Sequence, residues 1–433
     1  MRGRASTGSA LSSPALIDRR TVLAGIALLP GAAPGMAAAA FRPDPWPGCG
    51  LDLSRTPVRT PADWDRIYER NWGPLGTHTR DQVDRIIHAK NGLYDDSEAV
   101  FAWIVHYWLR AFIVMADLTG RARYMDSAVS FIHIILDNTD EKRVARGEIS
   151  GGYVRDPLYL RRTGRGGPFW KRGDWASVLD TGQVIRGLME FVDAVYRAPH
   201  RWAAYRPVAD QAFAASIQAA DAFDNDWQVI GDTGAYHYRD SQGSGQLGTT
   251  RTAFNQSATM VAAQLMIHKW RPDPGRLDKV RRLVRHWLAD YAVEMPDGSL
   301  TWRYILIPSN TDPEDAGHAT IDLEFLVAAF LSGRTDLTSA HMTGLVRTFR
   351  SRLYDGDRGL NKFVDGSSDA DFSEHFNAGF GWFGLARFDP AVADNALAIY
   401  AAHYPPDAPA GVLWARPMLG WANLLRAGRA CPD

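Results

Sequence analysis

The sequence predicts an all-α fold, an (α/α) toroid of about six to seven helical hairpins with long loops at one mouth. Apolar residues recur at three- to four-residue spacing in many segments, whereas strict alternation is scarce. Short connectors with Gly, Pro or Asp join pairs of segments, and longer loops separate the pairs. The chain shows no residue-level repeat, which disfavours the alternative of an open α-solenoid.

The periodic segments define the expected helices, at 79–90, 96–118, 122–138, 178–196, 205–226, 253–270, 275–294, 315–332, 338–353, 375–387, 390–403 and 411–427. Longer loops rich in Gly, aromatic residues and Arg lie between the hairpins, at 140–177, 228–252, 296–314 and 355–374. Because short and long connectors alternate, the long loops should gather at one end of the ring. Loops carry function on rigid scaffolds, so this end is where we expect the site.

Residues 1–40 have the pattern of an export signal that is cleaved. Arg19 and Arg20 precede an apolar run that is too short to span a membrane. We expect twin-arginine export to the periplasm or beyond, with an ordinary secretory signal as the alternative. Residues 41–433 would then form a single catalytic toroid domain, which we expect to be a monomer without a membrane span.

The composition restricts the possible partners. Lys and Arg number 48 and Asp and Glu 49, so the chain lacks the basic field of a nucleic-acid-binding protein. Nucleotide-binding, serine-hydrolase and zinc-protease motifs are missing, and we expect no cofactor, although a structural divalent metal stays open. Cys49 and Cys431, near the two ends of the mature chain, predict a disulfide in an oxidising compartment; two unpaired thiols are the alternative.

Helices that follow long loops begin with an unusually polar first turn, at 180–183, 255–257, 315–318 and 375–379. Capping accounts for one polar residue at each start, but not for two or three. Small residues beside them would let the inner helices crowd around a shared cavity. Asn255, Gln256, His375 and Asn377 are therefore candidate site residues.

The segment 313–325 holds the densest group of chemically active side chains. Glu314 and Asp315 suit the positive start of a helix, and His318 and Asp322 share one helical face. A His near a helix start tends to stay neutral and can accept a proton. Two other interpretations are a His that only fixes a neighbouring loop and a metal site built on His318 and Asp322.

The tripeptide Trp302-Arg303-Tyr304 lies just upstream. Arg303 could bind a carboxylate in bidentate fashion, and Tyr304 could donate or accept a proton. Trp302 could stack on a sugar face. The alternative is an amphipathic strand that packs Trp302 and Tyr304 inward.

Two other long loops repeat these residue types. His237, Tyr238 and Arg239 precede the helix that begins near Asn255. The loop 140–177 combines cations with aromatic residues, as expected of a binding wall for an anionic sugar chain, and its candidates are Tyr153, Arg155, Trp170 and Trp175. A solvated basic loop is the alternative.

At class level the chain resembles the toroidal polysaccharide lyases, which include alginate and glucuronan lyases. The resemblance rests on the export signal, the hairpin series over 79–427, and the Asn-Gln, Arg-Tyr and Glu-Asp-x-x-His clusters. It implies β-elimination from an anionic, uronic-acid polysaccharide. The matching residue types are Asn255 or Gln256 with Arg303 to neutralise the carboxylate, His237 or His318 as base, and Tyr304 as acid, with Tyr238 as its competitor.

Other functions fit the same pattern. An inverting glycoside hydrolase on a toroid would use paired carboxylates, for which the candidates are Asp96, Asp180, Glu314 and Asp315. A uronyl epimerase would share the proton abstraction of a lyase. An exported glycan-binding protein without catalysis would use only the aromatic loops.

Overall fold

The computed structural model describes residues 50–79, 83, 100–146, 167–168, 170, 177–237, 251–306, 312–369, 372–406 and 415–429. The chain divides into two units, Met1–Arg42 and Pro43–Asp433, and every described residue belongs to the second. The export signal lies outside the described residues, and so do Cys49 and Cys431. The disulfide stays a prediction, although the Gly50 amide donates to the Arg429 carbonyl at 2.7 Å, beside both cysteines in the sequence.

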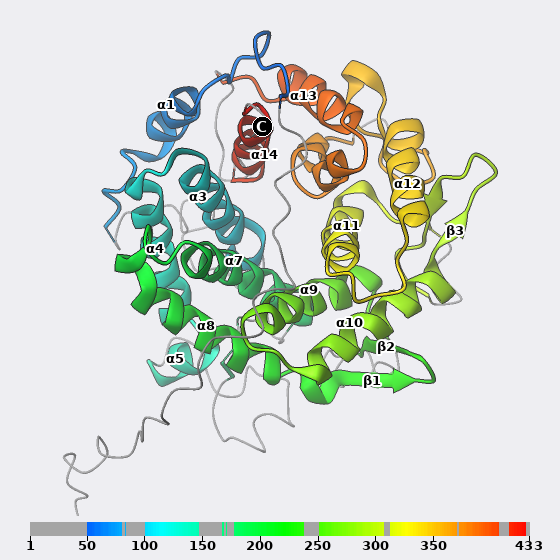
Figure 1. The fold of residues 1–433 in the computed structure, drawn as a ribbon, viewed down its shortest axis with the longest axis horizontal. Coiled ribbons are helices and arrows are strands. Elements are labelled where there is room, and N and C mark those ends of the chain that lie inside the picture. The colour runs from blue at the N-terminus through cyan, green and yellow to red at the C-terminus, as the bar shows by residue number, and fades with distance from the viewer. Residues whose placement is uncertain are drawn as a thin grey trace, which may run out of the picture. The chain divides into compact units, whose positions relative to one another are not determined.

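The second unit contains an inner ring of helices (Figure 1). Its members are α3 (His106–Thr119), α7 (Val178–Arg197), α9 (Phe254–Trp270), α11 (Ala316–Leu331), the 3₁₀ helices η10 (His375–Gly379) and η11 (Trp382–Arg387), and α14 (Ala415–Ala427). The helices α3, α7, α9 and α11 pack in succession, and α11 packs against both η10 and η11. The ring closes because η10 packs against α14 and α14 packs against α3.

A second layer of helices surrounds the first. It consists of α1 (Pro61–Trp72), α4 (Ala122–Asp137), α8 (Arg206–Asp221), α10 (Pro274–His286), α12 (Ser339–Thr348) and α13 (Ala391–His403). Outer helices pack on the inner ones, as α4 does on α3, α8 on α7 and α10 on α9. These two layers confirm the all-α, (α/α) toroid predicted from the sequence.

The burial of the helices follows their layer. In α3 all eleven residues from His106 to Ala116 are buried, as expected of a helix enclosed on every side. The outer helix α10 instead buries a stripe that includes Val280, Leu283 and Val284. Small residues let the inner helices approach one another, as expected. At Gly182 of α7, a Cβ atom would lie 2.8 Å from the amide nitrogen of Met260 in α9.

One described helical segment, Phe101–Thr119, is long and apolar enough to cross a membrane by length and composition. It joins the π-helical turn η2 (Phe101–Val105) to α3. Because 83% of its apolar window is buried inside the protein, this one segment is weak evidence for a membrane span.

The helix expected at 375–387 is instead the pair η10 and η11. Glycines here allow contacts that an α-helix with side chains would not. A Cβ atom at Gly379 would lie 2.4 Å from the ring of Tyr400, and one at Gly381 would lie 2.5 Å from the Thr320 carbonyl. Close packing against α13 and α11 therefore decides the backbone of this segment.

Several short elements were not predicted. They are the hairpin β1 (Trp227–Ile230) and β2 (Thr233–Tyr236), the pair β3 (Val293–Glu294) and β4 (Leu300–Thr301), the helix α1 and the short helix α5 (Asp140–Ala145). In β1–β2, Trp227 pairs with Tyr236 in antiparallel register. The expected helix 275–294 ends earlier, in a π-helical turn at Trp287–Tyr291 that leads into β3.

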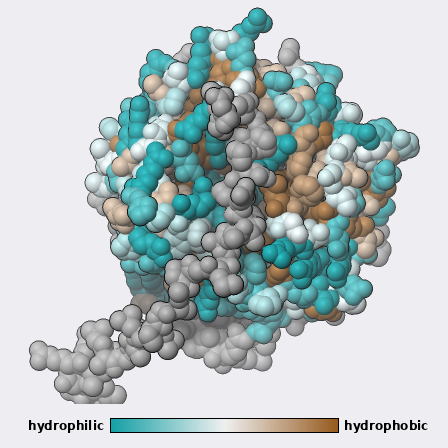
Figure 2. Space-filling model, in the orientation of Figure 1, coloured by the Kyte–Doolittle hydropathy of each residue, from teal (hydrophilic) through white to brown (hydrophobic). Residues whose placement is uncertain are grey.

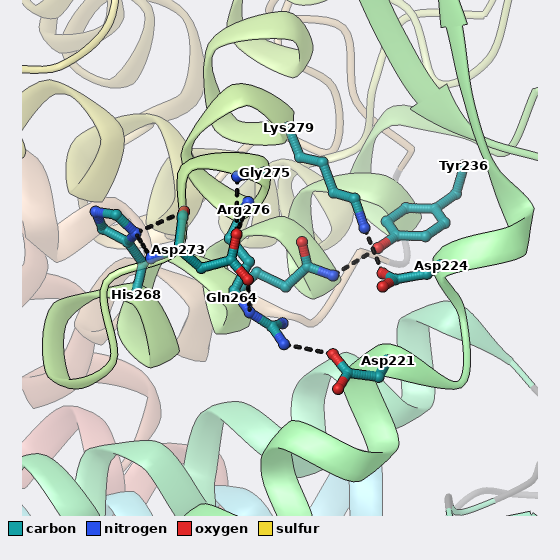
Figure 3. A network of polar contacts seen from close by, with 9 residues as sticks. All are labelled: Asp221, Asp224, Tyr236, Gln264, His268, Asp273, Gly275, Arg276 and Lys279. Carbon is teal, nitrogen blue, oxygen red and sulfur yellow. Dashed lines mark hydrogen bonds and ion pairs between the residues drawn. The ribbon is translucent and has the colours of Figure 1, made fainter.

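A polar network fixes the outer layer to the inner one (Figure 3). Arg276 of α10 pairs with Asp221 of α8, and Lys279 pairs with Asp224. Inside the network, the amide of Gln264 donates to the Tyr236 hydroxyl at 2.8 Å. Figure 2 shows hydrophilic residues along much of the rim of one face, with hydrophobic residues nearer its centre.

Candidate functional site

The inner helices α3, α11 and α14 contribute residues at or near their starts to a cavity of about 660 Å³. Its walls are Trp103 and Tyr107 from η2 and α3, Asp315, Gly317 and His318 from the start of α11, Lys362, Asp369, Phe372, Ser373 and Glu374 from the preceding loop of η10, Asn377 from η10, and Arg416 from α14. Of the four polar helix starts that we expected to gather, those of α11 and η10 contribute to the wall, whereas 180–183 and 255–257 do not. The start of α14 joins them without having been expected.

Asp315 and His318 form a carboxylate–imidazole pair on the cavity wall. Asp315 caps α11, since its Oδ1 accepts hydrogen bonds from the amides of Gly317 and His318 at 2.9 and 3.0 Å. Its Oδ2 lies 2.5 Å from Nδ1 of His318. The backbone that starts the helix therefore also orients the carboxylate toward the ring.

The charges of this pair stabilise each other. Burial lowers the pKa of His318, but the hydrogen bond and charge of Asp315 outweigh burial and raise it overall. Burial raises the pKa of Asp315, and the bond and charge of His318 outweigh it in the opposite direction. A helix start alone would lower the pKa of His318, whereas the neighbouring carboxylate raises it.

The carboxylate of Glu374 lies close to the start of α11 because Gly317 has no side chain there. A Cβ atom at Gly317 would lie 2.4 Å from Oε2 of Glu374, so a larger residue would push this carboxylate away. The side-chain amide of Asn377 donates to the Glu374 carbonyl at 2.8 Å and lies 3.4 Å from Oε2. Glu374 and the Asp315–His318 pair are therefore held on the same side of the cavity.

Two carboxyl groups lie buried behind the wall. Glu314 and Asp322 are fully buried, and the indole of Trp302 donates to Oδ2 of Asp322 at 2.8 Å. Burial raises the pKa of both groups, and the charges of Asp322 and Asp315 raise that of Glu314 further. Within the described residues, Oε2 of Glu314 and Oδ1 of Asp322 have no donor, which a proton held between the two groups would supply.

Three of these side chains form a candidate metal-binding group. Glu314, Asp315 and His318 offer one ligand atom each, all within 4.8 Å of one another. However, the Asp315 carboxylate already holds the Nδ1 proton of His318. A metal ion would have to displace that proton, so the geometry fits a proton-transfer pair better than a metal centre.

Four predicted site residues lie at the cavity or against it. His318 and Asn377 line the cavity, and the ring of Tyr304 lies 5.1 Å from that of His318, tilted by 34°. Glu314 lies behind the wall.

Other predicted residues lie elsewhere among the described residues. Arg303 is exposed and forms a β-bridge with Pro313, and His237 is buried in a bridge with Arg251. Asn255 is fully buried at the start of α9, followed by the half-buried Gln256. His375 is buried and accepts a hydrogen bond from the Leu360 amide at 3.0 Å. These side chains are not part of the cavity wall.

Two aromatic residues differ from the expectation that they contact sugar. Trp302 is 2% exposed and packs against Trp287 and Trp382, because its indole holds Asp322 in the core. Trp170 is 3% exposed, and its indole donates to the Ile135 carbonyl at 2.9 Å. The remaining candidates, Tyr153, Arg155, Trp175, Tyr238 and Arg239, lie outside the described residues.

Three residues that line the cavity were not predicted from the sequence: Trp103, Tyr107 and Arg416. Trp103 and Tyr107 belong to a continuous apolar segment that looks like core, and Arg416 stands in an ordinary amphipathic helix. Only the ring closure between α14 and α3 brings them together. The helix was expected to begin at 411, which would place Arg416 in its second turn, so no sequence signal distinguished this residue.

No family model and no curated protein matches this chain. Among solved structures, an alpha-1,6-mannanase, GH76A, of Salegentibacter sp. HEL1_6 is 11% identical, with a TM-score of 0.46, covering 84% of this chain and 99% of that one. A sugar epimerase from a ruminal bacterium is 13% identical, with a TM-score of 0.45 and coverages of 69% and 74%. A polysaccharide lyase is 12% identical, with a TM-score of 0.35 and coverages of 77% and 100%. Likeness at this level does not transfer an activity, so function has to be argued from the site.

Proposed function

We propose that this chain is an exported glycan-processing enzyme that cleaves a uronic-acid polysaccharide by β-elimination. The observation that carries the proposal is the Asp315–His318 pair, 2.5 Å apart on the wall of an open cavity. A His held by a carboxylate through Nδ1 presents Nε2 as a base, the arrangement that proton abstraction requires.

The reaction balances with the residues present. Neutral His318 takes the proton at C5 of the uronate, the C4–O bond breaks, and a C4–C5 double bond forms. The leaving oxygen then needs a proton. Tyr107 lines the cavity, and burial raises its pKa, so it is protonated at neutral pH and suits the role of acid. Tyr304, whose ring contacts that of His318, is the other candidate.

An inverting hydrolase is the second candidate, and Glu374 favours it as a carboxylate on the cavity wall. Its partner is harder to find among the described residues. Asp315 is engaged by two amides and by His318, and Asp369 pairs with Lys362. Asp180 is buried and accepts a hydrogen bond from Trp103 at 2.8 Å. The shortage of a second available carboxylate supports elimination over hydrolysis.

The test is to incubate the mature protein with alginate, glucuronan and polygalacturonate and to analyse the products. Elimination gives a C4–C5 unsaturated end that absorbs in the ultraviolet. New reducing ends without that absorbance would establish hydrolysis, and solvent deuterium at C5 without cleavage would establish epimerisation. Binding without any turnover would identify a glycan-binding protein. Each of these three results would overturn the proposal.

Two variants then assign the acid. Tyr107→Phe and Tyr304→Phe each remove one hydroxyl and leave the ring in place. If Tyr107 is the acid, Tyr107→Phe abolishes turnover with little change in substrate binding, while Tyr304→Phe keeps most of the activity. The reverse pattern assigns the acid to Tyr304.

A further inference from the structure

Arg416 is a cation whose position folding alone does not explain. It is the second residue of α14, where the positive end of the helix dipole disfavours a cation. The described residues provide no ion pair and no hydrogen bond for it, and its Nε is buried without an acceptor. Three destabilising features therefore meet in one side chain. An anion bound at the Nη atoms would neutralise the charge and so relieve the lack of an ion pair and the unfavourable position at the helix start.

The guanidinium is held in place by aromatic rings. Its central carbon lies 5.5 Å from the ring centre of Trp103, 5.2 Å from that of Tyr107 and 5.0 Å from that of Phe376. Cation–π contacts of this kind orient the planar group without using its hydrogen-bond donors. Arg416 is thus positioned in advance, and its Nη atoms have no acceptor among the described residues.

The other cations of the cavity are already neutralised. Lys362 pairs with Asp369, and His318 pairs with Asp315. Among the described residues that line the cavity, Arg416 is the cation without a carboxylate partner. An incoming anion therefore has one preferred place to bind.

We infer that Arg416, framed by Trp103, Tyr107 and Phe376, is the residue that binds the substrate carboxylate and makes the enzyme select acidic over neutral sugars. This inference deepens the proposed function, and it replaces Arg303 and Asn255 in the role of neutralising the carboxylate. A planar fork with two parallel N–H donors matches a carboxylate better than a hydroxyl. It also withdraws charge from the carboxylate when the neighbouring C5 proton is removed, and so acts in the same step as His318.

The experiment measures binding separately from turnover. Four-residue oligomers of mannuronate, glucuronate and galacturonate are titrated calorimetrically against the full mature chain, each beside its carboxyl-reduced, neutral counterpart. We expect at least one acid oligomer to bind about 10- to 100-fold more tightly than its neutral form, the range of hydrogen bonds to charged groups. Arg416→Gln should bring this ratio close to one, and Arg416→Lys should restore only part of it because Lys lacks the fork.

The matched control is Arg66→Gln, which removes an exposed Arg from α1 and should leave the preference unchanged. Circular dichroism and thermal unfolding of each variant show whether it is folded. If Arg416→Gln is unfolded, Arg416→Lys serves as the test, and full retention of the preference by Arg416→Lys would contradict a role for the fork. Equal binding of every acid–neutral pair, or no binding of any acid oligomer, would overturn the inference.

The outcomes separate this inference from the proposed reaction. Selective binding that depends on Arg416, without an unsaturated product, would contradict the proposed lyase reaction but support Arg416 as the carboxylate-binding residue. An unsaturated product whose kcat/KM does not change in folded Arg416→Gln would support the lyase and contradict the role of Arg416.

Discussion

Charged side chains are paired differently at the two ends of the inner helices. At the far end, Arg110 of α3 lies between Glu190 of α7 and Glu324 of α11, with nitrogen–oxygen distances of 2.9 and 2.7 Å. Arg186 bridges the same two glutamates. At the cavity end, Arg416 has no carboxylate partner among the described residues. The buried Glu314–Asp322 pair has His318 nearby, whose Nδ1 lies 3.8 Å from Oε1 of Glu314 but only 2.5 Å from Oδ2 of Asp315.

This difference separates charges that hold the ring together from charges left for a ligand. The far-end cluster links three inner helices, and each cation there is matched by carboxylates, as in the outer network of Figure 3. Buried charges are costly unless they are paired, so an unmatched charge on a cavity wall indicates a function other than folding.

The largest effect should come from His318→Ala, which tests the cavity end. Loss of the base should lower kcat by about 10²- to 10⁴-fold, the usual contribution of general acid–base catalysis. Turnover of an acid polysaccharide measures it, with exposed His200→Ala as the matched control. Activity within a factor of a few of the parent would remove His318 from the mechanism.

Arg110→Met tests the far end. It leaves Glu190 and Glu324 with Arg186 as their remaining shared cation among the described residues, so two carboxylates face one cation. Breaking buried pairs in this way costs up to about 3–5 kcal/mol of unfolding free energy. Urea unfolding measures the loss. The exposed pair of Arg66 with Asp63 provides the comparison, because Arg66→Gln should cost about 1 kcal/mol or less. A similarly small loss for Arg110→Met would show that the far-end cluster does not hold the ring together.

Asp315→Asn sharpens the interpretation of the pair. Asn still caps the helix, so the fold of α11 should survive. The change removes the charge that raises the pKa of His318, so the base becomes deprotonated at lower pH. The acid limb of the kcat/KM profile should therefore move to lower pH. A shift to higher pH, or none, would contradict the assignment of that limb to His318.

The smallest effect concerns Glu314→Gln. Burial raises the pKa of Glu314, so above the ordinary value of 4.5 the folded state binds a proton that the unfolded chain releases. Stability should therefore fall as pH rises through this range. Gln cannot ionise but can still accept from the Asp315 amide and donate to Asp322.

Urea unfolding at about pH 5 and about pH 8 measures this dependence. The loss of stability between the two should be smaller in Glu314→Gln than in the parent. An equal loss in both proteins would mean that Glu314 does not hold the proton.

The sequence predicted local features well where local spacing controls them. The segment expected as a helix at 122–138 is α4 at Ala122–Asp137, and Asp315 caps α11 in the expected place. Prediction failed where packing overrides propensity, as at 375–387, where Gly379 and Gly381 allow contacts with Tyr400 and Thr320. For Trp302, the alternative of inward packing holds in place of sugar stacking, since its indole donates to the buried Asp322.

By itself, the sequence determined the helical class, the hairpin order and the Glu-Asp-x-x-His segment, because helical periodicity and capping act over a few residues. Only the tertiary structure decided which other side chains join that segment. Trp103, Tyr107 and Phe376 surround Arg416 because α14 closes the ring against α3, a contact between distant parts of the chain. The tertiary structure also decided that the pKa of His318 is raised, since the 2.5 Å contact with Asp315 outweighs both burial and the helix dipole.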